Sequence, residues 1–141
     1  MIYDYDSNAI LPTPIKNRTS NTIVQAYTDT YDFLQSQGLR PRLQRLDNEA
    51  SKLLKAEMYK RDIDFQLAPP EIHRRNAAER AIRTFKNHFI AGLTSTDPAF
   101  PLHLWDRLIE QAALTLNLLR RSHINPRLSA YAQLNGQFDF N

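Results

Sequence analysis

The spacing of hydrophobic and polar residues predicts short strands and helices that follow one another along the chain. Residues 1–7 alternate between apolar and polar, as in a strand, and residues 9–16 form a second extended stretch whose two prolines confine it to a sheet edge. Apolar residues at helical spacing then follow Ser20, the expected N-cap, and stop before Gly38, where a C′ glycine belongs. The N-terminal part of the chain is therefore predicted to be two strands and a helix.

The rest of the chain alternates between segments with the two-residue period of a strand and segments with the helical period. Further elements are predicted as a strand at 42–47, a helix at 49–60, a strand at 63–70, and helices at 76–93 and 101–121. Residues 122–141 then form a turn, at Asn125 and Pro126, and a short helix. This order predicts one α/β domain over residues 1–141, with a mixed sheet flanked by helices.

The two long helices each carry an apolar stripe that predicts the buried face. The aromatic residues of this region, among them Trp105, are expected in the core as well. The stripes consist of Ala78, Ile82, Phe85 and Phe89 on the first helix and Leu104, Leu108, Ala112, Thr115 and Leu119 on the second.

Composition narrows the class of protein. Hydrophobic residues make up 42% of the chain and charged residues 23%, which is ordinary for a soluble globular domain. No apolar run approaches the ~20 residues of a membrane span, and the N-terminus does not read as a signal peptide. The absence of cysteine excludes disulfides and thiolate zinc sites and fits an intracellular, reducing compartment.

The basic charge is concentrated on the helix at 76–93 and on the residues just before it. Residues 71–88 contain five arginines and lysines against two glutamates, whereas the net charge of the whole chain is only +3. A polyanion-binding surface requires such a local excess, and a merely solvated helix face can show it too. The candidate contacts with a nucleic-acid backbone are Arg74, Arg75, Arg80, Arg83 and Lys86.

Glu79 is a carboxylate placed inside this basic segment. On a helical wheel, Arg83 and Lys86 fall within about 60° of it. A glutamate in a first turn stabilises the helix dipole and can pair with Arg83 four positions later. It can also hold a hard divalent cation beside the basic surface. The sequence pattern leaves both roles open.

Asp47 is the second candidate carboxylate. It stands at the carboxyl end of the strand at 42–47, where open α/β sheets place their ligands, and it is equally a candidate N-cap for the helix at 49–60. Two carboxylates from different elements can share two divalent ions ~3.5–4 Å apart, which activate a nucleophile and stabilise the leaving oxygen in phosphodiester chemistry.

In order and in register, these motifs resemble the catalytic core of retroviral and retrotransposon integrases. LDNEAS at 46–51 is similar to the strand-end motif that holds the family's second acidic residue, and HRRNAAERAIRTFKNHF at 73–89 is similar to the helix that holds the third. Glu79 lies 32 positions after Asp47, close to the family's spacing. The run LWDRLIEQAALTLNLLRRSHINPRLSAYAQLNG at 104–136 is similar to the long helix and the Asn-Pro…Tyr…Leu-x-Gly segment that follow in the family.

The resemblance implies an RNase H-like three-layer fold with extra C-terminal helices. It implies that Asp47 and Glu79 are catalytic ligands of two Mg²⁺ or Mn²⁺ ions, that DNA is the partner, and that two copies of the chain can pair. The implied activity is DNA integration by metal-dependent phosphodiester cleavage and strand transfer, which would take place in the nucleus.

The chain also departs from the family pattern. Glu49 and Ala77 stand where the family commonly has glycine. The two N-terminal strands immediately precede the first helix and so match the family's second and third strands. The central first strand, with its aspartate, is therefore expected to be missing from an N-terminally truncated core. Asp4 and Asp6, on one face of the strand at 1–7, are weaker candidate metal ligands.

Two other functions stay open at this point. One is a non-catalytic remnant of an integrase that only binds nucleic acid or pairs with a second copy, because two of three catalytic acids are present. The other is an RNase H-type nuclease, which shares the fold but not the helix motif and the Asn-Pro segment.

Overall fold

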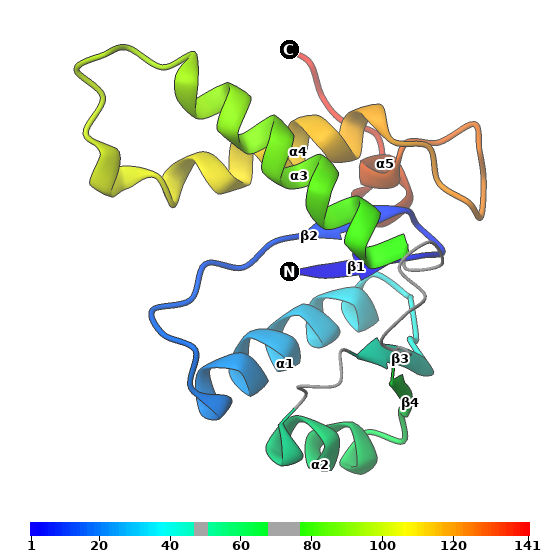
Figure 1. Cartoon of the computed structure of the whole chain (residues 1–141). Helices are drawn as coiled ribbons and strands as arrows, with labels where there is room; N and C mark the ends of the chain where they lie inside the picture. The colour runs from blue at the N-terminus through cyan, green and yellow to red at the C-terminus, as the bar shows by residue number, and fades with distance from the viewer. Residues whose placement is uncertain (47–50, 68–76) are drawn as a thin grey trace. The chain divides into compact units, whose positions relative to one another are not determined.

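The computed structural model describes residues 1–46, 51–67 and 77–141 (Figure 1). The chain forms two compact units, one of Met1–Pro14 with Ala77–Asn141 and one of Ile15–Asn76. We call these the terminal unit and the central unit and describe each by itself. Within the described ranges, no helix is long and apolar enough to cross a membrane.

The terminal unit begins with a short hairpin. Strand β1 (Ile2–Asp4) pairs antiparallel with β2 (Ala9–Leu11), so that Tyr3 lies opposite Ile10. Both strands are shorter than the predicted 1–7 and 9–16, because a turn occupies 5–8 and prolines follow β2 and cannot donate to a strand ladder. The period-two pattern thus predicted the strands but not their ends.

The helices of the terminal unit follow the order expected from the sequence. Figure 1 shows α3 and α4 lying against each other, and α5 close to the end of α4. The elements are α3 (Ala77–Thr94), a 3-10 turn η2 (Leu102–Leu104), α4 (Arg107–Leu119) and α5 (Ala130–Asn135). The single helix predicted at 101–121 is therefore a 3-10 turn followed by a shorter α-helix. The predicted turn at Asn125 and Pro126 is confirmed, with Leu128 N donating to Asn125 O at 2.9 Å.

The core of the terminal unit lies between β2, α3 and α4. Partly buried Tyr3, Phe89 and Ala113 pack against this cluster from its edges. Burial of these apolar groups is the main favourable term for holding the two helices and the hairpin together. The buried cluster consists of Ile10, Ala81, Phe85, Ile109, Ala112 and Leu116.

The buried face of α4 differs from the predicted stripe. Ile109, Ala112 and Leu116 are buried, whereas Leu119 is 75% exposed and Trp105 is 45% exposed. The prediction for Ala112 was right and those for Leu119 and Trp105 were wrong. The predicted stripe lay at one edge of the apolar arc of α4, and the contacts with α3 and β2 centre the buried face on Ile109, Ala112 and Leu116.

The central unit contains two helices and a parallel strand pair. It consists of α1 (Ser20–Ser36), β3 (Leu43–Leu46), α2 (Lys52–Lys60) and β4 (Asp64–Leu67). Strand β3 pairs with β4 in register Leu43 to Asp64, and α1 packs on α2. The buried apolar residues of this unit are Tyr27, Tyr31, Leu34, Leu54, Met58 and Ile63.

The helix caps of the central unit correct two assignments made from the sequence. The N-cap of α1 is Thr19, whose hydroxyl accepts from Thr22 N, and not Ser20. The N-cap of α2 is Ser51, whose hydroxyl accepts from Leu54 N, so α2 has its cap without Asp47. The predicted C′ glycine is confirmed, since Gly38 has φ 85°.

The four strands within the described ranges pair two by two rather than in one mixed sheet. β1 with β2 is antiparallel and β3 with β4 is parallel. A mixture of strand directions is therefore present, but no described strand joins the pairs.

Candidate functional site on helix α3

Helix α3 separates an apolar face from a basic one. Ala81 and Phe85 are buried, and Ile82 and Phe89 are partly buried, which places the apolar face about 110° around the helix from Glu79. Phe85 and Phe89 stack on the same helix with ring centroids 5.9 Å apart, and the Phe89 ring meets the Trp105 ring edge-on at 6.4 Å. The predicted stripe was right for Phe85, while Ala81 is the more deeply buried alanine.

The basic face of α3 consists of Arg80, Arg83 and Lys86, all exposed. Their spacing of three positions spreads the three cations over an arc of about 120° and about 9 Å of helix length. Among the described residues, neither Arg83 nor Lys86 forms an ion pair with a carboxylate. Two cations of this face are thus available to an anionic partner.

The charge of Arg80 also acts on the hairpin of the terminal unit. Burial raises the pKa of the Tyr3 hydroxyl above its usual value, and the nearby positive charges of Arg120 and Arg80 oppose this rise. Tyr3 donates to Asn8 Oδ1 at 2.9 Å, and the Arg120 guanidinium lies 5.6 Å from the Tyr3 ring centroid. A cationic environment therefore extends from the start of α3 to β1.

Glu79 lies in the first turn of α3, within the arc of the basic face, and is partly buried. A carboxylate here is favoured by the helix dipole. Carboxylate oxygens are also suitable ligands for hard divalent cations. The position of Glu79 therefore fits both roles that the sequence pattern left open, stabilising the helix and binding a divalent cation.

Several other site candidates lie outside the described residues. These are Asp47, Arg74 and Arg75, and for them the assignment from sequence stays a prediction. Within the described ranges, no group of three or more histidine or acidic side chains is arranged to hold a metal ion.

The two weaker candidate ligands lie at the hairpin of the terminal unit, Asp4 at the end of β1 and Asp6 in the turn. The Asp4 carboxylate accepts from the backbone N of Ser7 at 2.9 Å and from its hydroxyl at 2.5 Å. Asp6 lies in the turn rather than on the strand, so the expectation that both aspartates share a strand face was wrong. The Asp6 backbone carbonyl accepts from His123 N and Ile124 N. Asp4 thus has a structural partner that accounts for its presence.

The sequence reasoning missed a second basic region, after the end of α4. Arg120, Arg121 and Arg127 lie near the loop that leads to α5. The pair Arg120-Arg121 is visible in the sequence, but it closes a mostly apolar helix, where a cation is expected to complement the dipole. Only the approach of the loop brings Arg127 near Arg120 and Arg121.

Comparisons with known proteins define the fold. No protein-family model matches the sequence, and no curated protein matches it. Among solved structures, the chain is similar to the crystal structure of the catalytic core domain of BIV integrase, with a TM-score of 0.65 and 14% sequence identity. The match covers 94% of this chain and 81% of that one. The chain therefore shares the fold of a retroviral integrase catalytic core over the matched part of its length.

Proposed function

We propose that this chain is a DNA-binding domain of a retroelement integrase that cleaves and joins DNA phosphodiesters. The observation that carries the proposal is the integrase-core fold over 94% of the chain. The exposed basic face of α3 supports it independently, because two of its cations, Arg83 and Lys86, face solvent and form no ion pair with a carboxylate of the described residues. An RNase H-like three-layer arrangement with a mixed sheet is part of this proposal.

The basic face has the role of holding the DNA backbone. Arg80, Arg83 and Lys86 neutralise phosphates, and the sequence makes Arg74 and Arg75, which precede the helix, candidates for the same role. Arginine can bind one phosphate through two parallel N–H groups, which orients the backbone as well as attracting it. Lysine acts as a point charge.

Asp47 and Glu79 are the proposed ligands of Mg²⁺ or Mn²⁺. When bound, two such ions polarise the scissile phosphodiester and stabilise the attacking and leaving oxygens. The donor chemistry of Glu79 fits this role, since it offers carboxylate oxygens at a helix start that faces a cationic surface. The protein's own contribution is to fix this carboxylate on a rigid helix and to hold the DNA backbone beside it.

Salt-dependent DNA binding tests the first half of the proposal. We expect the affinity for a short duplex, measured by fluorescence anisotropy, to fall with salt by about 0.9 log units per phosphate contact for each log unit of salt. Replacing Arg80, Arg83 and Lys86 together with alanine should lower that slope by up to about 2.7.

The control for this experiment removes three exposed cations from the central unit. Lys16→Ala, Arg18→Ala and Lys60→Ala make the same change in net charge at exposed positions. If both triple variants lose affinity equally, the effect is one of net charge and the basic face of α3 is only a solvated surface.

Cleavage in the presence of Mn²⁺ tests the second half. Asp47→Asn and Glu79→Gln should each abolish cleavage and strand transfer while leaving the salt slope of DNA binding unchanged. Binding by the unaltered chain without any metal-dependent cleavage would instead identify a non-catalytic nucleic-acid-binding module.

A further inference from the structure

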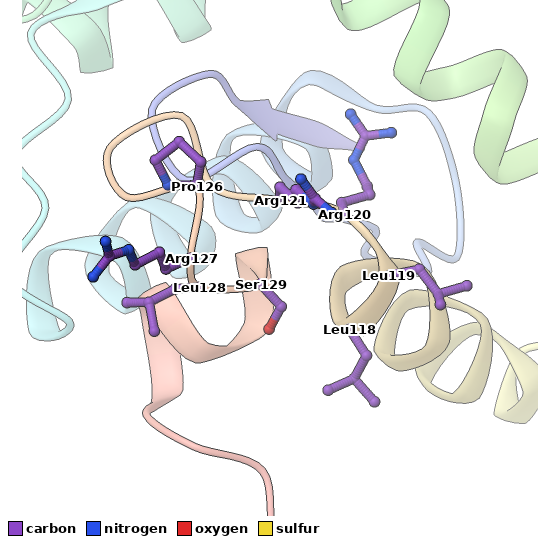
Figure 2. Close-up of a pocket in the computed structure, with 8 residues that line it drawn as sticks. All are labelled: Leu118, Leu119, Arg120, Arg121, Pro126, Arg127, Leu128 and Ser129. Carbon is purple, nitrogen blue, oxygen red and sulfur yellow. The ribbon is translucent and has the colours of Figure 1, made fainter.

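The terminal unit carries an open hollow of about 460 Å³ between the end of α4 and the loop that leads to α5 (Figure 2). Residues of α4 line one part of it and residues of the loop line another. Its lining consists of Leu118, Leu119, Arg120, Arg121, Pro126, Arg127, Leu128 and Ser129. The hollow lies outside the basic face of α3 and has no part in the proposed function.

The polar part of the lining is cationic. Arg120 is held in place, because its Nε donates to Asn8 O at 2.9 Å and its Nη2 donates to Asn8 Oδ1. Arg121 and Arg127 are exposed and form no ion pair with any described carboxylate. No aspartate or glutamate lines the hollow. A ligand for this surface must therefore carry negative charge.

The other part of the lining is aliphatic. Leu118, Leu128 and Pro126 contribute apolar surface, and Leu119 is 75% exposed at the end of α4. A phosphodiester backbone has no apolar group to cover these side chains, and the lining offers no aromatic ring on which a base could stack. An acidic peptide with a large apolar side chain matches both parts of the lining.

The same chain contains a segment with this chemistry at 138–140, Phe-Asp-Phe. Phe138 packs edge-on against Tyr131 of α5, with ring centroids 5.3 Å apart, and so ties the segment to its own helix. Asp139 is exposed, and Phe140 is 83% exposed. The charge and the apolar group that the hollow needs are thus both presented to solvent by the chain itself.

We propose that residues 138–140 of a second copy of the chain dock in this hollow. The Asp139 carboxylate accepts from the guanidinium groups of Arg121 and Arg127, and the Phe140 ring covers the exposed leucines. Each copy has one such segment and one hollow, and exchange of the two segments between two copies closes a two-fold dimer. The contact is small, and we expect it to be weak, with a Kd on the order of 0.1 mM.

Sedimentation velocity over a range of protein concentrations tests this contact. The unaltered chain should show a concentration-dependent shift from monomer to dimer. The tail variant Asp139→Arg and the hollow variant Arg121→Asp with Arg127→Asp should each remain monomeric over the same range. Phe140→Ala should weaken the dimer by about tenfold, because it removes the apolar part of the contact.

Mixing the two charge-reversed variants gives the sharpest test. The reversed segment of one copy then faces the reversed hollow of the other, and the second contact joins a native segment to a native hollow. We expect the mixture to dimerise although neither variant does so alone. The matched control, Lys16→Asp with Arg18→Asp, changes the net charge by as much as the hollow variant and should dimerise like the unaltered chain.

Three outcomes would overturn the proposal. A chain that stays monomeric at the highest concentration has no such contact. A dimer that survives in both charge-reversed variants uses another surface. If the hollow variant instead loses as much affinity for a DNA duplex as the triple alanine variant of α3 does, the hollow is a nucleic-acid surface.

Discussion

Asn117 shows how one polar side chain fixes a helix against a strand. Its amide accepts from Ile10 N at 2.9 Å and donates to Ile10 O at 2.9 Å, so both backbone groups of a buried residue are satisfied by α4. Strand β2 has only β1 as a strand partner within the described ranges. The amide of Asn117 therefore takes the place of a further strand at this point.

We expect Asn117→Leu to lower the free energy of unfolding by about 2–4 kcal/mol, because it leaves a buried N–H and a buried C=O without partners. Urea denaturation followed by circular dichroism measures this change. Gln111→Leu, at an exposed position on the same helix, should change stability by no more than about 0.5 kcal/mol. Equal effects of the two substitutions would show that the Asn117 hydrogen bonds contribute nothing specific.

Tyr27 makes the stability of the central unit sensitive to high pH. Its burial raises the pKa of the hydroxyl to about 12, and the neighbouring Tyr31 adds to this rise. The unfolded chain loses this proton near the ordinary tyrosine pKa of about 10, whereas the folded chain keeps it until about 12. Stability is therefore unaffected by this group below pH 10 and falls as pH rises from about 10 to about 12.

We expect this fall to amount to roughly 2–3 kcal/mol and to be absent in Tyr27→Phe. Urea denaturation at several pH values across this window measures it. Tyr59→Phe is the matched control, because it removes a tyrosine that is 86% exposed and should leave the fall intact. If the stability of Tyr27→Phe falls with pH as steeply as that of Tyr59→Phe, another group causes the loss of stability.

At the scale of elements, the cap residues determine where each helix begins. The N-cap of helix α1 lies one residue before the expected cap: the Thr19 hydroxyl accepts from Thr22 N, and it also donates to Asn17 Oδ1 at 2.8 Å. Ser20, the cap expected from the sequence, is the first helical residue. Adjacent serine and threonine residues give the same sequence signal, and the course of the preceding loop selects between them.

Thr19→Ala should therefore lower stability by about 1 kcal/mol, while Ser20→Ala should be nearly neutral. Thermal unfolding of the two single variants under identical conditions measures the difference. A larger loss of stability for Ser20→Ala than for Thr19→Ala would show that Ser20 is the N-cap, as expected from the sequence.

At the scale of the whole molecule, bound metal should couple to stability. A ligand that binds only the folded chain stabilises it by about 1.4 kcal/mol at ten times its Kd. If Asp47 and Glu79 both contribute ligands, Mn²⁺ should raise the melting temperature of the unaltered chain, and Asp47→Asn and Glu79→Gln should each abolish the rise. This readout does not depend on activity.

Asp4→Asn and Asp6→Asn are the controls for the metal experiment. Asp4→Asn should lower the melting temperature without metal, because it weakens the bonds from Ser7, yet the rise on adding Mn²⁺ should persist in both variants. If the rise in melting temperature on adding Mn²⁺ is lost in Asp4→Asn or Asp6→Asn but kept in Glu79→Gln, the metal binds at the hairpin instead.

The sequence by itself determined the features that depend on local structure. The period of the apolar residues and the glycines and prolines between them were enough to predict the order of strands and helices, because secondary structure follows from neighbours within a few positions. The basic face of α3 was predictable for the same reason: Arg80, Arg83 and Lys86 are brought together by a single helix, whatever it packs against.

Tertiary structure decided the features that depend on competition between surfaces. The apolar arc of α4 carries more leucines than the core buries, so its contacts with α3 and β2 select Ile109 and Leu116 for burial and leave Leu119 exposed. The pairing of Asn117 with Ile10 and the hollow beside Arg127 each join residues far apart in the chain. No local pattern contains such contacts, because they arise only when separate elements exclude water from the same core.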